Sequence, residues 1–134
     1  DHLDLHSFPT RRSSDLAVVS YANDAKEKVL SVPRDVLERS GAVSAQAVRA
    51  MARGVLALSG ADVSASVSGI AGPGGGTPEK PVGTVWIGLA SRAGKTREIL
   101  LALEGGREGI RAESARRALS ELRSFVDEFN GASS

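Results

Sequence analysis

A tyrosine and a lysine stand close together near the start of the chain, in the segment VVSYANDAK at residues 18–26. Tyr21 ends an apolar, β-branched run that is typical of a buried strand, and Lys26 lies about one turn into the helix predicted after it. In an open α/β sheet, a strand end and the next helical turn can face the same crevice, where such sheets bind ligands. A lysine tuned by burial or by neighbouring cations can take the proton of a serine nucleophile. The pattern alone also fits a solvated Lys26 and a Tyr21 at the edge of the core.

The second feature that could do chemistry is a segment rich in glycine and proline, GIAGPGGGTPEKPVG, at residues 69–83. It separates two strand-like stretches, and long loops inside compact domains are usually binding or catalytic loops. Glycine lets the main chain approach a ligand and turn N–H groups toward an anion, whereas proline stiffens the loop. The segment matches neither the P-loop pattern nor the dinucleotide-binding GxGxxG pattern. It therefore predicts a preformed pocket wall, with a mobile surface loop as the alternative.

Composition limits the classes of function. The 134 residues carry a formal net charge of +1, which argues against a dedicated nucleic-acid-binding protein. The chain has no cysteine, which excludes a thiolate zinc site, and its only histidines, His2 and His6, leave no histidine downstream as a base or a metal ligand. We expect no metal and no cofactor. No apolar run reaches the roughly 20 residues of a membrane span, and the start lacks the apolar core of a secretory signal. These features predict a cytoplasmic protein that binds neither nucleic acid nor membrane.

The first sixteen residues differ in character from the rest. The stretch HSFPTRRSSDL at 6–16 shows neither helical nor strand periodicity, and it resembles the translation of a synthetic sequencing-library adaptor. We therefore expect residues 1–16 to be a non-native segment, with a natural basic tail as the alternative. Residues 17–134 are expected to form one domain.

Hydrophobic periodicity predicts the elements that position the candidate residues. Strands are predicted at 16–21, 61–69, 84–90 and 96–104. The first predicted helix begins at Asp24 after a cap at Asn23, and the second runs from a cap at Ser44 to a cap at Gly60. The last predicted helix spans 107–129. The side chains expected on the buried face of the last helix are Ala115, Ala118, Leu119, Leu122, Val126 and Phe129. Helices and strands interleave, which predicts a single-domain layered α/β sandwich, a mixed sheet with helices packed on its faces.

Three blocks of sequence carry a family resemblance. They are VVSYANDAKEKVLSVPRDVLERSGAVS at 18–44, SGIAGPGGGTPEKPVGTVWIGLA at 68–90 and GGREGIR at 105–111. In this order, over about residues 17–129, they resemble the CinA C-terminal domain family, the nicotinamide-nucleotide amidases, and the central block is the most specific. The resemblance implies a metal-free hydrolysis of nicotinamide mononucleotide to nicotinic acid mononucleotide and ammonia. It also implies a homodimer.

The resemblance further implies roles for individual residues. Lys26 would be the general base, Tyr21 would assist in the same proton network, and Asn23 would position them. The loop would wall the nucleotide and offer N–H groups to a phosphate or an oxyanion, through Gly69, Gly72, Gly74, Gly75, Gly76 and Thr77. Arg107, before the last helix, would clamp a phosphate or a carboxylate, with an exposed first-turn arginine as the alternative.

The sequence departs from the family pattern in three ways. It contains no ESCTGG-like motif, which holds the family's nucleophilic serine, so residues 17–134 are expected to lack the first strand and helix of the domain and to be inactive alone. Ala22 replaces a serine, and Gly106 replaces an aspartate beside Arg107. The serines that we considered as replacement nucleophiles are better explained as sheet residues: Ser20, Ser64, Ser66 and Ser68. The alternative function is a non-catalytic nucleotide-binding or competence-related interaction module.

Overall fold

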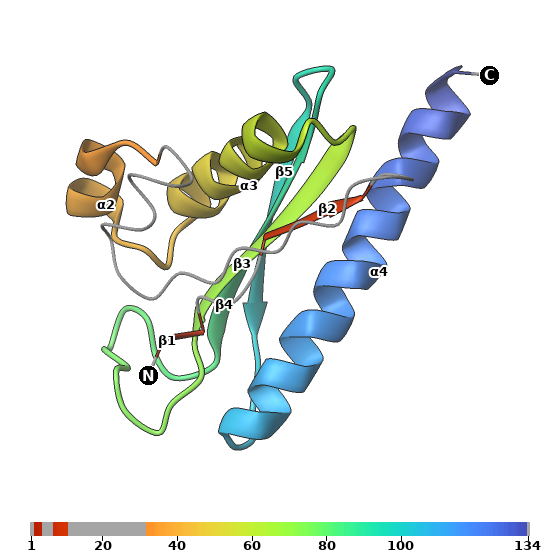
Figure 1. Cartoon of the computed structure of the whole chain (residues 1–134). Helices are drawn as coiled ribbons and strands as arrows, with labels where there is room; N and C mark the ends of the chain where they lie inside the picture. Colours follow the sequence, from red (N-terminus) through yellow and green to blue (C-terminus); the bar gives the residue numbers. More distant parts are fainter. Residues whose placement is uncertain (1, 4–6, 11–31, 134) are drawn as a thin grey trace.

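The fold is a layered α/β sandwich, described by a computed structural model for residues 2–3, 7–10 and 32–133. In chain order its elements are β1 (His2–Leu3), β2 (Ser7–Thr10), α2 (Arg34–Ser40), α3 (Ala45–Ser59), β3 (Val63–Ile70), β4 (Thr84–Ser91), β5 (Thr96–Ala102) and α4 (Arg107–Ser133). The sheet forms the middle layer, with α3 on one face and α4 on the other (Figure 1). The strand predicted at 16–21 and the helix predicted from Asp24 lie outside the described residues.

The sheet is built on an antiparallel meander of β3, β4 and β5, and both short strands, β1 and β2, pair with β3 on its other edge. The predicted layered α/β class is confirmed. Every described strand pair is antiparallel. The described strands therefore form an antiparallel sheet and not the predicted mixed one, and the strand predicted at 16–21 lies outside the described residues.

β2 is a strand that the sequence pattern did not predict, because residues 6–16 show no alternation. Ser7–Thr10 pairs with the stretch of β3 from Val63 to Ser66. Edge pairing satisfies main-chain N–H and C=O groups and does not require alternating side chains, so periodicity is a poor guide to such a strand. The origin of residues 1–16 stays a prediction.

The caps predicted for α3 are confirmed. The Ser44 side chain accepts a hydrogen bond from the Ala47 N–H (3.1 Å) and donates one to the Gly41 carbonyl (2.9 Å). Gly60 ends the helix in the left-handed conformation, with φ of 67°. Capping residues are reliable sequence signals because each one pairs a main-chain N–H or C=O group that the end of the helix leaves without a partner.

The alternation predicted for the first long strand is also confirmed. The serine face of β3 lies under α3, and all three hydroxyl groups are buried. Each donates to a main-chain carbonyl of α3 or of the turn before it: Ser64 to Ala52 (2.6 Å), Ser66 to Val48 (2.6 Å) and Ser68 to Ala42 (2.8 Å). Small hydroxyl side chains therefore fasten the helix closely to the sheet. This agrees with their interpretation as sheet residues.

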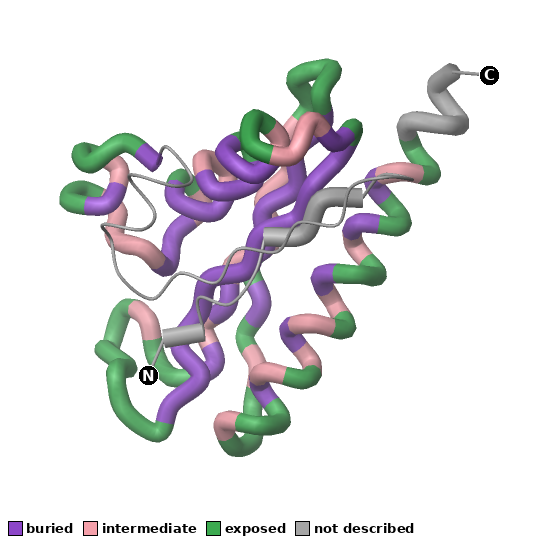
Figure 2. Tube along the Cα trace, in the orientation of Figure 1, coloured by how far each residue is buried: buried purple, intermediate pink, exposed green. Residues whose placement is uncertain are grey.

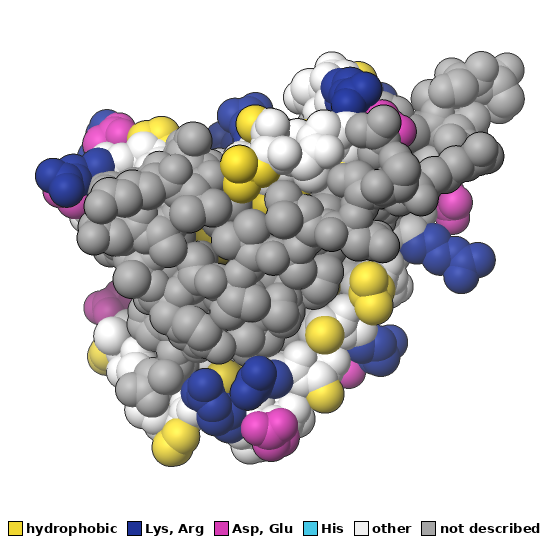
Figure 3. Space-filling view, viewed as in Figure 1, with side chains coloured by type: hydrophobic (Ala, Val, Ile, Leu, Met, Phe, Trp, Pro, Cys, Tyr) yellow, Lys and Arg dark blue, Asp and Glu magenta, His cyan; other side chains and the backbone are white. Residues whose placement is uncertain are grey.

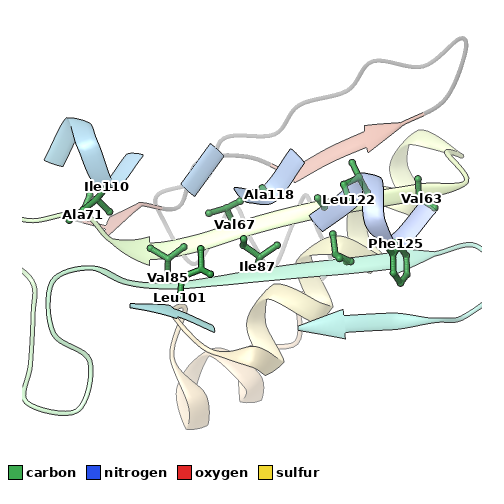
Figure 4. Close-up of a cluster of buried hydrophobic side chains, with 12 residues drawn as sticks. Val63, Val67, Ala71, Val85, Ile87, Leu101, Ile110, Ala118, Leu122 and Phe125 are labelled. Carbon is green, nitrogen blue, oxygen red and sulfur yellow. The ribbon is translucent and has the colours of Figure 1, made fainter. Parts of the chain in front are cut away.

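The opposite face of the sheet packs against α4 in the main apolar cluster (Figure 4). The predicted buried face of α4 is partly wrong, because Leu119 is 58% exposed while Ile110, Ser114 and Phe125 are buried. The Ser114 hydroxyl donates to the Ile110 carbonyl within the helix (2.7 Å). A hydroxyl group that has a hydrogen-bond partner can be buried at little cost. A serine can therefore lie on the buried face of α4, whereas the prediction from apolar periodicity considered only apolar residues for that face.

Candidate functional site

The loop between β3 and β4 is fixed at both of its ends. The Gly83 N–H donates to the Ile70 carbonyl (2.7 Å), which joins the exit of the loop to its entry. The Leu103 N–H donates to the Gly83 carbonyl (2.9 Å), which joins the loop to the segment after β5. The loop therefore projects from one end of the sheet, and hydrogen bonds join its two ends to each other and to the segment after β5.

Glycine conformation and a tight turn shape the loop further. Gly72 and Gly75 adopt φ of 79° and 89°, a region that favours glycine. Thr77 and Lys80 close a turn with two hydrogen bonds of 3.0 Å, from the Thr77 N–H to the Lys80 carbonyl and from the Lys80 N–H to the Thr77 Oγ1. Residues 73–79 are all exposed (Figure 2). The loop thus combines an exposed surface with internal hydrogen bonds and a fixed base.

Arg107 is the first residue of α4, and the fold brings it to this loop. Its half-buried guanidinium donates from Nη1 to the Gly72 carbonyl (2.9 Å). Basic side chains gather over the start of α4 in the space-filling view (Figure 3). Within the described part of the chain, the other guanidinium N–H groups of Arg107 have no hydrogen-bond partner. Arg107 therefore holds the loop and keeps donors that could bind an anion.

The other loop residues predicted for the site fall into two groups. Gly69 is buried inside β3, where an added Cβ would lie 2.8 Å from the Thr84 carbonyl oxygen, so its position is set by sheet packing. Gly74, Gly75 and Gly76 are exposed, and their N–H groups bond to nothing among the residues that the structure describes. Those three N–H groups are therefore available as donors in the exposed part of the loop.

The three residues predicted for catalysis and its support, Tyr21, Asn23 and Lys26, lie outside the described residues. Among the residues that are described, no three His, Asp or Glu side chains are grouped so as to hold a metal ion. The helices described here include none that is long and apolar enough to cross a membrane.

A cleft of about 430 Å³ lies beside the loop, and the sequence analysis did not anticipate it. Its lining residues come from the α2–α3 junction, the loop and β4: Ser40, Val43, Ser44, Ala45, Gln46, Lys80 and Trp86. Lys80 Nζ donates to the Ser40 carbonyl at the end of α2 (2.9 Å), a favourable place for a cation. The available signal was the single tryptophan, placed just after a loop that carries a lysine.

The sequence pattern of a known family covers most of the chain. A family model described as the CinA C-terminal domain matches residues 12–126. The chain belongs to this family. The exposed loop and Arg107 thus lie within a CinA C-terminal domain.

Relatives in the CinA family are closely similar in sequence. The domain is 55% identical over 104 residues to a CinA-like protein of Akkermansia muciniphila, covering 78% of this chain and 25% of that protein. It is 49% identical over 113 residues to a protein of Enterobacter agglomerans named nicotinamide-nucleotide amidohydrolase PncC, covering 84% and 69%. The chain thus spans about a quarter of the length of the first relative and just over two thirds of the second.

Solved structures of the CinA superfamily share the fold. The competence/damage inducible protein CihA of Agrobacterium tumefaciens superposes with a TM-score of 0.77 at 42% identity, over 79% of this chain and 65% of that one. The competence damage-inducible protein A of Klebsiella pneumoniae gives 0.77 at 39% identity, over 82% and 68%. At these identities the CinA fold is shown together with the family.

Proposed function

We propose that this CinA domain serves the hydrolysis of the amide of nicotinamide mononucleotide, giving nicotinic acid mononucleotide and ammonia in pyridine nucleotide recycling. The observation that carries the proposal is the bond between Arg107 and Gly72 at the base of an exposed loop with free N–H donors. The similarity to a relative named nicotinamide-nucleotide amidohydrolase supports it. A small-molecule nucleotide is the partner that this proposal requires.

The exposed part of the loop suits the anionic end of such a nucleotide. Free N–H groups at Gly74, Gly75 and Gly76 can surround a phosphate oxygen, because consecutive glycines allow main-chain donors to converge. Arg107 can add a charge-assisted hydrogen bond from donors that Gly72 does not use. Neither contact needs a metal ion or a cofactor.

The proposed reaction also requires a nucleophile and a base. Lys26 would take the proton of the nucleophilic serine, with Tyr21 in the same network and Asn23 positioning them. The printed sequence has no ESCTGG-like motif, so we expect it to bind but not to hydrolyse. Tests of catalysis therefore use a serine-restored protein, defined as residues 17–134 joined behind an ESCTGG-bearing segment from a relative.

A cytoplasmic location stays a prediction.

Replacing Gly75 by valine in the serine-restored protein should weaken binding of nicotinamide mononucleotide by about tenfold or more, a loss on the order of one charge-assisted hydrogen bond. The reason is local, because Gly75 is exposed and has φ of 89°, so a β-branched side chain displaces the loop donors. Calorimetric titration measures the affinity, and thermal unfolding measures stability.

The matched control is Gly94→Val. Gly94 is also exposed and has φ of 96°, but it lies in the turn between β4 and β5 at the other end of the strands. It should lower Tm about as much as Gly75→Val and leave nucleotide affinity unchanged. A large loss of Tm in Gly75→Val with full affinity would show that the loop is structural and does not line the site.

A further inference from the structure

Three successive carbonyls between α2 and α3 each accept a hydrogen bond from a side chain. The donors belong to the cap of α3, to β3 and to the glycine-rich loop: Ser44 Oγ to Gly41 (2.9 Å), Ser68 Oγ to Ala42 (2.8 Å) and Lys80 Nζ to Ser40 (2.9 Å). The first two bonds fix this turn to α3 and to the sheet. The carbonyl of Ser40, one of those that the end of α2 leaves without a helical partner, is therefore a firmly placed acceptor for Lys80.

Lys80 is the outward connection of the exposed part of the loop. Among the residues that the structure describes, it is the only member of the stretch 73–80 whose hydrogen bonds reach outside the loop. It takes part in none of the ion pairs formed within that part of the chain. The other connections of the loop lie at its base and at Gly72, which Arg107 holds.

The bond to Ser40 is passed on to the glycines of the loop through the turn that Thr77 and Lys80 close. The two hydrogen bonds of that turn, each 3.0 Å long, make Thr77 follow Lys80. Residues 74–76 lie between this turn and Gly72, so the stretch is fixed on both sides. Glycine has more main-chain freedom to lose than any other residue, and two fixed points reduce that freedom before a ligand binds.

The charged end of Lys80 lies against the turn between α2 and α3. The side chain is half-buried, and a Cβ added to Gly41 would be 3.4 Å from Nζ. Its stem lines the cleft beside Trp86, whereas residues 73–79 are all exposed. This placement favours an internal contact of the ammonium group over a contact with a ligand on the exposed loop.

We propose that Lys80 is a positioning residue of the loop, whose bond to the Ser40 carbonyl holds the N–H groups of residues 74–76 in the arrangement that receives an anion. The inference rests on the proposed function for the nature of that anion, the phosphate of a nucleotide. Binding to a loop that is already ordered costs less conformational entropy, so the bond raises affinity although Lys80 does not touch the ligand.

Lys80→Met in the 134-residue chain tests this role, because methionine keeps most of the apolar stem and removes the ammonium donor. Relaxation of the main-chain amides, measured by NMR, reports the order of the loop without any ligand. Order parameters at residues 74–76 should be near the value of about 0.85 for rigid main chain in the parent, and below about 0.6 in Lys80→Met. Affinity for nicotinamide mononucleotide, measured by calorimetric titration, should fall roughly three- to tenfold, with Tm within a few degrees of the parent.

Lys95→Met is the matched control, because it removes the same charge from the turn between β4 and β5, at the other end of the strands. It should leave both loop order and affinity unchanged. Unchanged loop order in Lys80→Met, or an equal loss of order in Lys95→Met, overturns the inference. A loss of affinity without a loss of order overturns it too, because Lys80 would then contact the ligand directly. A parent chain that does not bind nicotinamide mononucleotide refutes the proposed function, and the order parameters still decide the role of Lys80.

Discussion

In the serine-restored protein, replacing Lys26 by alanine should lower kcat for ammonia release by roughly 10²–10⁴-fold, the range of a general base. Without Lys26, no group at this position takes the proton of the serine, although the substrate still binds. KM for nicotinamide mononucleotide should therefore change much less than kcat. Steady-state ammonia release at saturating substrate measures the loss.

Two further variants make the result specific to proton transfer. Lys26→Arg should not recover activity, because a guanidinium does not give up its proton near neutral pH. Lys28→Ala should keep turnover near that of the parent, because residues two apart on a helix do not share a face. Near-normal turnover in either Lys26 variant would remove this lysine from the mechanism.

Replacing Gly88 by alanine should destabilise the domain by about 3 kcal/mol, the cost of forcing an atom into a packed core. An added Cβ at Gly88 would lie 2.3 Å from the Val48 carbonyl oxygen and 2.7 Å from the Ser66 hydroxyl oxygen. These two atoms hydrogen-bond to each other (2.6 Å), so α3 would have to move away from β4 and strain that contact. Denaturant unfolding, followed by circular dichroism, measures the loss.

Gly109→Ala is the control for that experiment. Gly109 lies in the first turns of α4, and nothing lies within 4 Å of the position of its added Cβ. Alanine should therefore be neutral there or should stabilise the domain by up to about 1 kcal/mol through helix propensity. A Gly88→Ala protein as stable as the parent would show that α3 is not seated tightly on the sheet.

Sequence patterns predicted the parts of the fold whose signals are local. Ser44 and Gly60 were identified as caps because each acts on a helix-end group within a few residues. The serine face of β3 was predicted because alternation assigns side chains to faces of a strand. The layered class followed from the order of the elements, and the glycine-rich loop was recognised by composition.

The features that local patterns did not predict depend on contacts between distant segments. The pairing of Ser7–Thr10 with β3 follows from an available sheet edge, which no pattern within residues 6–16 reports. The burial of Ser114 depends on its bond within α4 and on the packing of that helix across the sheet.

For the candidate site, the family resemblance predicted Arg107 as a clamp for a phosphate or a carboxylate, but its bond to Gly72, which joins positions 35 residues apart, was not anticipated. The bond of Lys80 to Ser40 spans 40 residues, and neither that bond nor the cleft beside it was anticipated. Periodicity cannot report such contacts, because it describes only which face of one element is apolar. The positions of Tyr21, Asn23 and Lys26 stay predictions.

We propose that this CinA domain supplies the base and the nucleotide-binding loop of an amide hydrolysis whose nucleophile is a serine. The most direct test compares ammonia release from nicotinamide mononucleotide by the serine-restored protein, by the same protein with that serine replaced by alanine, and by residues 17–134 alone. We expect turnover in the first only, with nicotinic acid mononucleotide formed in equal amount. Comparable turnover by residues 17–134 alone would place the nucleophile within them, and tight binding without turnover in the serine-restored protein would instead identify a non-catalytic nucleotide-binding module.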